Sequence, residues 1–412
     1  MKILGNWLLC AAIVWVLSLT GSAIFGYLKP HGHSVFEIYA VASRGWWNSA
    51  DNIYQYQAET DEIYRYSPLF AVVTSPLAYL PLGAGTALWK VFNTVIFAGS
   101  LWFWLRRGIT HRLTSNELGV AFLLALPVAL LSLHIGQATM LMVGLMMVAN
   151  VAIHGNRWWL AAGLLAAATL VKVYPLAYAA VLGVVYWRQF SWRFLICLTV
   201  GLGLPLIAQS PAYAFDQTVH WFQQLGDGAE INRDRLKSLD RLLEIIGLPL
   251  PRRVFLGLGA LAGLGVLGVT FVYHQFGVDR KETLSRCLAW YLAWVLLFSP
   301  GTEPVTFSIL APVLAWAILV AFRRPGAWFD RGLLAVSLFL VGPIQTDLVG
   351  KAGREFGGSF AAPTWGALLF VVWLTMELVR FLTSSRRASS NPPASLPGNS
   401  TGQTLPAPDS SA

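Results

Sequence analysis

One cation interrupts an otherwise apolar stretch of the chain. Lys172 follows residues 166–171 (AAATLV) and stands shortly before Pro175. An ionisable residue at the centre of a membrane span costs about 2.5–3.5 kcal/mol on insertion scales, so it is a functional hypothesis by default. A phosphate is the natural partner of such an ammonium group. The alternative is a lysine whose long stem snorkels to the membrane interface.

A second cation stands at the entrance to another apolar segment. Arg65 and Tyr66 lead through Ser67 into Pro68. A guanidinium can hold a phosphate by paired hydrogen bonds, and Pro68 could begin a helix whose N-terminus favours an anion. We therefore predict that Arg65 and Tyr66 bind substrate, although Arg is also a common interfacial anchor.

Carboxylates and aromatic rings alternate in the long polar segment 29–67. Aromatic faces pack on sugar rings, and a carboxylate can take a proton from an attacking hydroxyl. The alternative is a solvated loop with an interfacial aromatic belt. The residues concerned are His31, His33, Glu37, Tyr39, Trp46, Trp47, Asp51, Tyr54, Tyr56, Glu59, Asp61, Glu62, Tyr64 and Tyr66.

Glu37 is the carboxylate of this segment with the most apolar neighbours, in the run Val35-Phe36-Glu37-Ile38-Tyr39. A carboxylate that is poorly solvated is a stronger base, which makes Glu37 the candidate catalytic residue. It could equally lie on the polar face of a short interfacial helix.

Three further residues are candidate substrate ligands. His134 and Gln137 enclose a tight turn between two apolar runs, and both side chains can hydrogen-bond a ligand. Glu303 follows Ser299-Pro300-Gly301-Thr302 at another such turn, where it could support the site or hold a metal. A capped turn and a solvated carboxylate are the respective alternatives.

No cofactor or nucleotide motif accompanies these residues. The chain has no phosphate-binding glycine loop, no zinc spacing and no nucleophile elbow, and its three cysteines have no metal-type spacing. We therefore expect no metal and no cofactor. An activated donor, if there is one, is expected to arrive through the lipid.

The composition predicts a membrane protein. The 412 residues are 56% hydrophobic and 12% charged, against about 25% charged in soluble domains. A net charge of +9 does not indicate nucleic-acid binding, because many of the basic residues stand in short loops between apolar runs. The first apolar run is too long for a signal peptide, so we read it as a retained membrane helix.

Apolar runs that cross or nearly cross a bilayer recur throughout the chain. The segment 68–83 is short and proline-rich, and we interpret it as re-entrant or interfacial. The twelve predicted spans lie near 6–28, 84–105, 117–134, 138–153, 158–173, 174–187, 194–209, 254–275, 287–299, 305–322, 332–346 and 363–382.

Basic residues give these spans an orientation. With Lys2 inside, every short basic connector falls on the cytoplasmic side, as the positive-inside rule demands. The outer side then holds loops 29–83, 210–253 and 347–362, with Lys351 and Arg354 as exceptions. The inner connectors carry Arg106, Arg107, Arg112, Arg157, Arg188, Arg193, Arg280, Lys281, Arg286, Arg323, Arg324, Arg331, Arg386 and Arg387.

The composition changes near the C-terminus. Residues 384–412 become rich in Ser, Pro, Ala and Gly, which cannot offset the entropy lost on folding. We therefore predict a transmembrane domain over 1–383 and a disordered cytoplasmic tail over 384–412.

Four stretches in order resemble glycosyltransferase family 87, over roughly residues 5–380. They are Tyr64-Arg65-Tyr66-Ser67-Pro68-Leu69-Phe70, Ile135-Gly136-Gln137-Ala138, Val171-Lys172-Val173-Tyr174-Pro175-Leu176 with Ala161-Ala162-Gly163-Leu164 before it, and Ser299-Pro300 with Glu303 and Ala311-Pro312.

The resemblance implies an all-α polytopic bundle of the GT-C type with about twelve transmembrane helices. It also implies a bacterial inner-membrane hexosyltransferase that takes a sugar, mannose among the candidates, from a polyprenyl-phosphate donor. The acceptor would be a lipid or glycan at the outer face, and the inverting transfer would need no metal.

One position departs from the family pattern. The family is expected to have an acidic base in the first outer loop, often an Asp directly before a Phe-x-x-Tyr stretch. In this chain Val35 holds that place, and Glu37 follows two residues later. A transporter or lipid flippase, with polar residues along a path near the midplane, and a non-catalytic relative remain the alternative functions.

Overall fold

The computed structural model describes residues 6–31, 34–56, 60, 62–227, 236–299 and 301–390, without the side chains of 226, 227 and 386–390. His33, Glu59, Asp61 and Pro300, which the sequence analysis drew on, lie outside the described residues, as does the predicted tail from residue 391.

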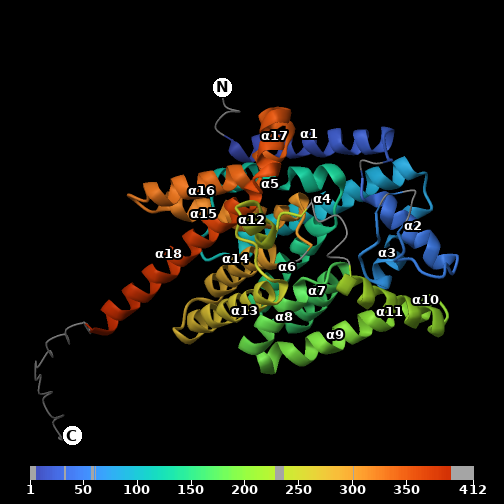
Figure 1. The fold of residues 1–412 in the computed structure, drawn as a ribbon. Coiled ribbons are helices and arrows are strands. Elements are labelled where there is room, and N and C mark those ends of the chain that lie inside the picture. The colour runs from blue at the N-terminus through green and yellow to red at the C-terminus, as the bar shows by residue number, and fades with distance from the viewer. Residues whose placement is uncertain are drawn as a thin grey trace, which may run out of the picture. The chain divides into compact units, whose positions relative to one another are not determined.

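Helices make up most of the described chain (Figure 1). The first half contains α1 (Trp7–Leu28), α2 (Phe36–Trp47), α3 (Pro68–Ala78), α4 (Leu82–Arg107), α5 (Ser115–Ile135), α6 (Thr139–His154), α7 (Trp158–Val171), α8 (Pro175–Val185), the π-helical turn η2 (Trp187–Ser191), α9 (Trp192–Gly203) and α10 (Pro205–Ala208).

The second half contains α11 (Pro211–Asp227), α12 (Leu239–Ile245), α13 (Arg252–Gln275), α14 (Arg280–Phe298), the 3₁₀ turn η4 (Pro304–Leu310), α15 (Ala311–Arg323), α16 (Trp328–Val341), the 3₁₀ turns η5 (Pro343–Gln345) and η6 (Asp347–Val349), α17 (Gly350–Ser359) and α18 (Ala362–Ser390). The predicted outer loops therefore contain helices of their own, namely α2, α11, α12 and α17.

The prediction of an all-α polytopic membrane protein is confirmed. Each of the twelve predicted spans coincides with helix, and within the described residues seven helices are long and apolar enough to cross a membrane, or eight if the bent pair 328–359 counts as one. The lower number arises because α6, α7 and α8 have only 16, 14 and 11 residues, and because α14 begins with the charged residues Arg280, Lys281, Glu282 and Arg286. Helices α7 and α8 adjoin each other.

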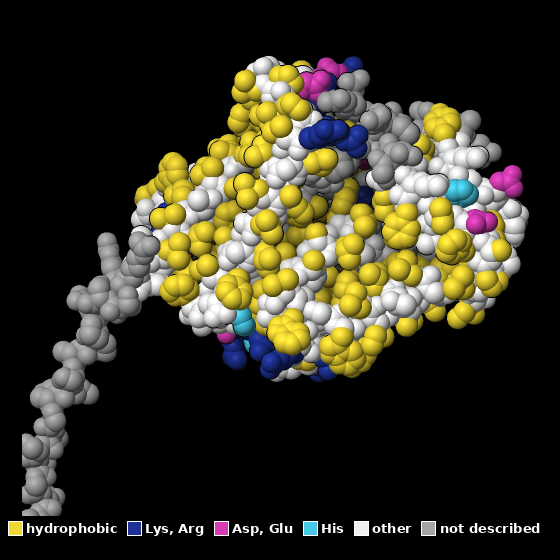
Figure 2. Space-filling view, turned by 60° about the horizontal axis from the view of Figure 1, so that its bottom comes forward, with side chains coloured by type: hydrophobic (Ala, Val, Ile, Leu, Met, Phe, Trp, Pro, Cys, Tyr) yellow, Lys and Arg dark blue, Asp and Glu magenta, His cyan; other side chains and the backbone are white. Residues whose placement is uncertain are grey.

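One helix forms the centre of the bundle. The span from η4 through α15 is 89% buried, and it packs against α5, α14 and α16. By contrast, the spans of α1 and α13 are only 17% and 22% buried. On the face drawn in Figure 2, hydrophobic side chains cover most of the middle, and charged side chains gather near the margins. This distribution fits a surface that faces lipid.

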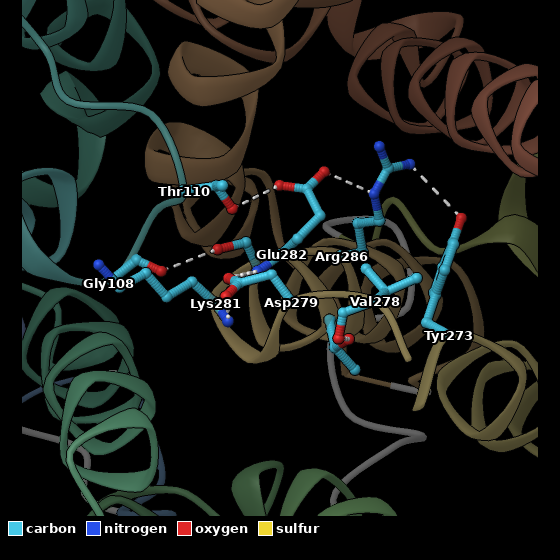
Figure 3. A network of polar contacts seen from close by, with 10 residues as sticks. Gly108, Thr110, Tyr273, Val278, Asp279, Lys281, Glu282 and Arg286 are labelled. Atoms are coloured by element: carbon cyan, nitrogen blue, oxygen red, sulfur yellow. Dashed lines mark hydrogen bonds and ion pairs between the residues drawn. The ribbon is translucent and has the colours of Figure 1, made fainter. Parts of the chain in front are cut away.

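The basic connectors lie together on one side of the bundle. Figure 3 shows Glu282 accepting hydrogen bonds from Thr110 at 3.2 Å and Arg286 at 2.7 Å, which joins the α4–α5 connector to α14. Arg280 donates to Asn156 in the α6–α7 connector at 2.7 Å and lies over the ring of Tyr186 beside η2.

The α15–α16 connector joins the same side. Arg323 donates to Glu117 at 2.7 Å and to the carbonyl oxygen of Arg112, both near the start of α5. All five basic connectors between α4 and α16 are therefore linked to one another by contact, as the charge pattern predicts.

The chain divides into two compact units, residues 1–374 and 375–412. Helix α18 continues through Ser390, so residues 384–390 of the predicted tail are helical. Within the second unit, Arg380 pairs with Glu377 at 2.7 Å. The predicted boundary at residue 383 stays a proposal.

Close packing of α1 against α5 depends on a glycine. A Cβ atom at Gly119 would lie 2.2–2.4 Å from backbone atoms of Trp7 and Leu8. Farther along the same pair, Trp15 Nε1 donates to the carbonyl oxygen of Phe122 at 3.0 Å. The two backbones therefore approach as closely as the missing side chain permits.

We predict that Gly119→Ala destabilises the protein by about 1–3 kcal/mol, because overpacking forces α1 away from α5. The check is the midpoint of thermal unfolding in one detergent. Gly99→Ala is the control, since nothing lies within 4 Å of a Cβ at that position in α4. An equal midpoint for the two variants would contradict the packing argument.

Candidate active site

A cavity of about 580 Å³ opens at the side of the bundle away from the basic connectors. It is called the main cavity below. Its lining residues are Val35, Ile38, Tyr39, Glu62, Ile63, Arg65, Tyr66, Gln137, Lys172, Val173, Tyr174, Leu176, Ala177, Ala180, Gln224, Leu225, Trp294, Val295, Phe298, Ser299, Gly301, Glu303 and Thr306.

The connectors that line the main cavity alternate along the chain with the basic ones. They are the segment before α3, the α5–α6 turn, the α7–α8 break and the α14–η4 turn. Successive connectors of antiparallel helices emerge at opposite ends, so the cavity and the basic connectors lie at opposite ends of the helices. Five predicted site residues meet in the cavity: Arg65, Tyr66, Gln137, Lys172 and Glu303.

Lys172 stands at the point where a membrane helix is broken. Helix α7 ends at Val171, Lys172 has an extended backbone, and α8 begins at Pro175. The Nζ atom lies 5.7 Å from the ring centre of Tyr66 and 5.8 Å from that of Tyr174. Within the described residues the Lys172 ammonium makes no hydrogen bond or ion pair within 4.0 Å. It is held by ring faces and keeps its donors for a ligand.

Arg65 is close enough to Lys172 for their charges to interact. Its Nη1 atom is 3.6 Å from Oε1 of Glu303, and the charges of both residues act on Lys172. The Nε atom of Arg65 is buried and has no hydrogen-bond partner among the described residues. A buried donor without a partner is costly, and an anionic ligand in the cavity would satisfy it.

A serine brings the two cations together. Ser67 is the N-cap of α3, whose first residue is Pro68, as the sequence predicts. Its hydroxyl accepts from Phe70 N at 3.3 Å and donates to the carbonyl oxygen of Leu170, in the last turn of α7. Arg65 and Lys172, each two residues from this bond, therefore share the cavity wall.

Two tyrosine hydroxyls form a directed chain at the cavity wall. Ala138 N donates to the Tyr39 hydroxyl at 3.3 Å, and that hydroxyl donates to the Tyr66 hydroxyl at 2.8 Å. Burial raises the pKa of both phenols well above its usual value, so both keep their protons. The hydrogen of the Tyr66 hydroxyl is then available to a ligand.

The α5–α6 turn fixes Gln137 in the wall. Gly136 has φ 73°, and its carbonyl oxygen accepts from Trp89 Nε1 at 2.6 Å. Asn93 donates to the carbonyl oxygen of Gln137 at 2.8 Å, and Thr139 donates to its side-chain oxygen at 2.9 Å. The side-chain nitrogen of Gln137 remains as a donor.

The rest of the main cavity is apolar and reaches the surface of the bundle. Leu176 and Ala180, one turn apart on α8, line the cavity and are exposed, and Val184 continues the exposed face by another turn. Opposite them, Trp294 on α14 donates to the carbonyl oxygen of Gly259 at 2.8 Å, which ties α14 to α13. The cavity thus combines a cationic end with an apolar wall that opens sideways.

A smaller hollow of about 280 Å³ adjoins the polar end. It is lined by Glu62, Leu131, Ile135, Lys237, Glu303, Pro304 and Val305. Glu62 and Glu303 belong to both linings, so these two carboxylates stand where the hollows meet.

Two predicted site residues do not line either hollow. Glu37 lies in the first turn of α2, is 8% exposed, and its Oε1 atom is 2.6 Å from Nδ1 of His31. His134 lies in the last turn of α5, where its ring centre is 5.1 Å from that of Phe25. Val35, one position before α2, does line the main cavity. The base role of Glu37 stays a prediction.

Other lining residues escaped the sequence analysis. Gln224 and Leu225 belong to α11, which is tied to the first outer loop by hydrogen bonds between Gln217 and the backbone of Asp51 and Ile53. The amphipathic pattern of 211–227 was the available signal. Tyr174 follows Lys172 by two residues and could have been chosen with it. Nothing local distinguishes Trp294 or Phe298 from lipid-facing residues.

Comparison with known proteins identifies the family of this site. Glycosyltransferase family 87 matches residues 64–300, more than half of the chain. A polyprenol-phosphate-mannose-dependent alpha-(1-2)-phosphatidylinositol pentamannoside mannosyltransferase of Mycobacterium tuberculosis (strain CDC 1551 / Oshkosh) is 26% identical over 403 residues, covering 92% of this chain and 88% of the relative. The chain belongs to glycosyltransferase family 87 and is a multi-pass membrane glycosyltransferase.

Proposed function

We propose that this enzyme is a GT-C-type transferase that moves a hexose from a polyprenyl-phosphate donor to a lipid or glycan acceptor. The transfer takes place at the outer face of a bacterial cell membrane. Mannose is the leading candidate for the sugar, because the Mycobacterium relative is named for a polyprenol-phosphate-mannose donor.

The observation that carries the proposal is the division of the main cavity into a cationic end and an apolar wall. Arg65 and Lys172 can hold the donor phosphate, and Tyr66 and Gln137 can donate hydrogen bonds to the phosphate or the sugar. The exposed face of α8 at Leu176 allows the polyprenyl chain to extend into lipid. A soluble nucleotide-sugar has no lipid chain that would occupy such an opening.

The cations also suit the reaction. When the bond between the sugar and phosphate breaks, negative charge grows on the departing phosphate, and positioned cations stabilise that charge. The Glu303 carboxylate, 3.6 Å from the Arg65 guanidinium, helps to position that cation. The proposed transfer inverts the anomeric centre and calls on no cofactor.

The sidedness of the proposal rests on the positive-inside rule. The linked basic connectors would face the cytoplasm, together with both termini, and the main cavity would face outward. The two basic exceptions in the outer segment are offset by carboxylates: Arg354 pairs with Asp347 at 2.7 Å, and Lys351 lies 3.8 Å from Glu355.

The direct test is incubation of the purified protein with a panel of radiolabelled polyprenyl-phosphate sugars and membrane lipid extract. Label should move to an extractable lipid or glycan with one member of the panel. No transfer from any member by a folded sample would refute the proposed function.

Lys172→Met is expected to lower the turnover number about 100- to 1,000-fold, the loss typical when a positioned charge-stabilising donor is removed. The protein should keep its elution volume and melting midpoint. Lys351→Met, at a lysine whose side chain is 80% exposed on α17, is the control and should transfer normally. Full activity of Lys172→Met would rule out its phosphate role.

Ala180→Trp should raise the KM for long-chain donors about tenfold, equivalent to ~1.4 kcal/mol of lost binding, because the indole fills the apolar wall. A donor with a short prenyl chain should be affected much less. Val184→Trp, one turn farther and outside the lining, is the matched control. Equal effects of Ala180→Trp on both donors would argue against a polyprenyl site there.

Single cysteines introduced into a variant without Cys10, Cys197 and Cys287 test the sidedness. Ser359→Cys on α17 should react with a membrane-impermeant maleimide in intact cells, whereas His111→Cys should react only after permeabilisation. Both positions are exposed. The opposite labelling pattern would place the main cavity in the cytoplasm.

A further inference from the structure

The junction of the two hollows contains the carboxylates that the reaction can use. Glu62 and Glu303 line both the main cavity and the smaller hollow. A general base must reach the acceptor hydroxyl, which in turn must reach the anomeric carbon of the donor. With the donor in the main cavity, a group that meets both conditions lies where the two hollows join.

The smaller hollow has the chemistry of a sugar site. The carboxylates of Glu62 and Glu303 and the ammonium of Lys237 can hydrogen-bond ring hydroxyls, whereas Leu131, Ile135, Pro304 and Val305 offer an apolar surface to the ring face. Few polar groups set against an apolar wall are typical of a small-ligand site.

Backbone contacts fix Lys237 beside this hollow. Its N–H donates to the carbonyl oxygen of Thr302 at 2.7 Å, next to Glu303, and its own carbonyl oxygen accepts from Thr364 at the start of α18. Lys237 is therefore anchored to the same turn that carries Glu303, although it belongs to the outer loop 210–253. The hollow is built by four segments far apart in the sequence, at Glu62, the end of α5, Lys237 and residues 303–305.

The two carboxylates have different surroundings. Glu303 lies 3.6 Å from Arg65, and it also interacts with Lys172, so its charge is committed to the cations that hold the phosphate. This contact gives Glu303 a role in positioning the Arg65 guanidinium. Glu62 stands three residues before Arg65 on the other segment that lines both hollows. Glu37 is engaged with His31 and lines neither hollow.

We infer that Glu62 is the proton acceptor of this enzyme and that the smaller hollow binds the sugar ring of the acceptor. This inference rests on the proposed function. The acceptor hydroxyl oxygen bonds to the anomeric carbon, the bond from that carbon to the phosphate oxygen breaks, and polyprenyl phosphate leaves with the electron pair. The hydroxyl proton passes to the Glu62 carboxylate.

Glu62→Gln tests the base, since it keeps the shape of the side chain and removes its basicity. Transfer should fall about 100- to 10,000-fold, the range that general bases contribute. Binding of the radiolabelled donor, measured by filtration without acceptor, should stay within about twofold. Glu62→Asp should retain more activity than Glu62→Gln. Full transfer by Glu62→Gln would overturn the assignment.

Two comparison variants separate Glu62 from other carboxylates. Glu355→Gln, at a glutamate whose side chain is 64% exposed on α17, is the control for loss of an outer carboxylate and should transfer normally. Glu37→Gln tests the rival assignment. A loss confined to Glu37→Gln, with Glu62→Gln active, would return the base role to Glu37.

Leu131→Trp tests the acceptor site independently of the base, because the indole fills the smaller hollow. It should raise the KM for acceptor at least tenfold and leave the KM for donor unchanged. An unchanged KM for acceptor would refute the acceptor site. If the wild-type protein transfers no sugar from any donor, the proposed function fails, and that result is distinct from either variant's failure.

Discussion

The break between α7 and α8 is the constraint on which the site depends. Backbone groups at membrane depth need partners within the protein, so a helix can be interrupted there only where other groups take over. The Ser67 hydroxyl donates to the carbonyl oxygen of Leu170, and the Tyr291 hydroxyl donates to that of Tyr174. These two bonds give the carbonyl oxygens on either side of the break a hydrogen-bond partner. Lys172, between them, has an extended backbone and lines the main cavity.

The same bonds explain why the site is assembled from distant parts of the chain. Ser67 can reach α7 only if the segment carrying Glu62 and Arg65 lies against the break. Tyr291 aligns α14, whose C-terminal end leads to Glu303. The break therefore positions both cations and both carboxylates at once. A continuous helix over 158–187 would have left Lys172 facing lipid or packed helix, with no cavity for an anion.

The sequence could predict the charged part of the site but not its walls or its pairings. Lys172, Arg65 and Glu303 are conspicuous because ionisable residues are rare near apolar runs, and the break at Pro175 follows from proline's missing N–H. Glu37 was an equally suitable candidate by sequence, because the sequence pattern does not show that its carboxylate pairs with His31 in the fold. Trp294 resembles any lipid-facing residue, because lipid and a lipid-binding cavity select the same side chains.

The balance of charge in the main cavity favours the products of the proposed reaction. A polyprenyl-phosphate sugar is a phosphodiester with one negative charge, whereas the departing phosphate monoester carries nearly two at neutral pH. Glu303 offsets part of the positive charge of Arg65 and Lys172, so a monoanion already suffices for the ground state. The remaining attraction grows as the bond breaks, and only interactions that strengthen toward the transition state accelerate a reaction. Val35 contributes no charge to this balance, and in the proposed reaction the proton passes to Glu62 at the junction of the hollows.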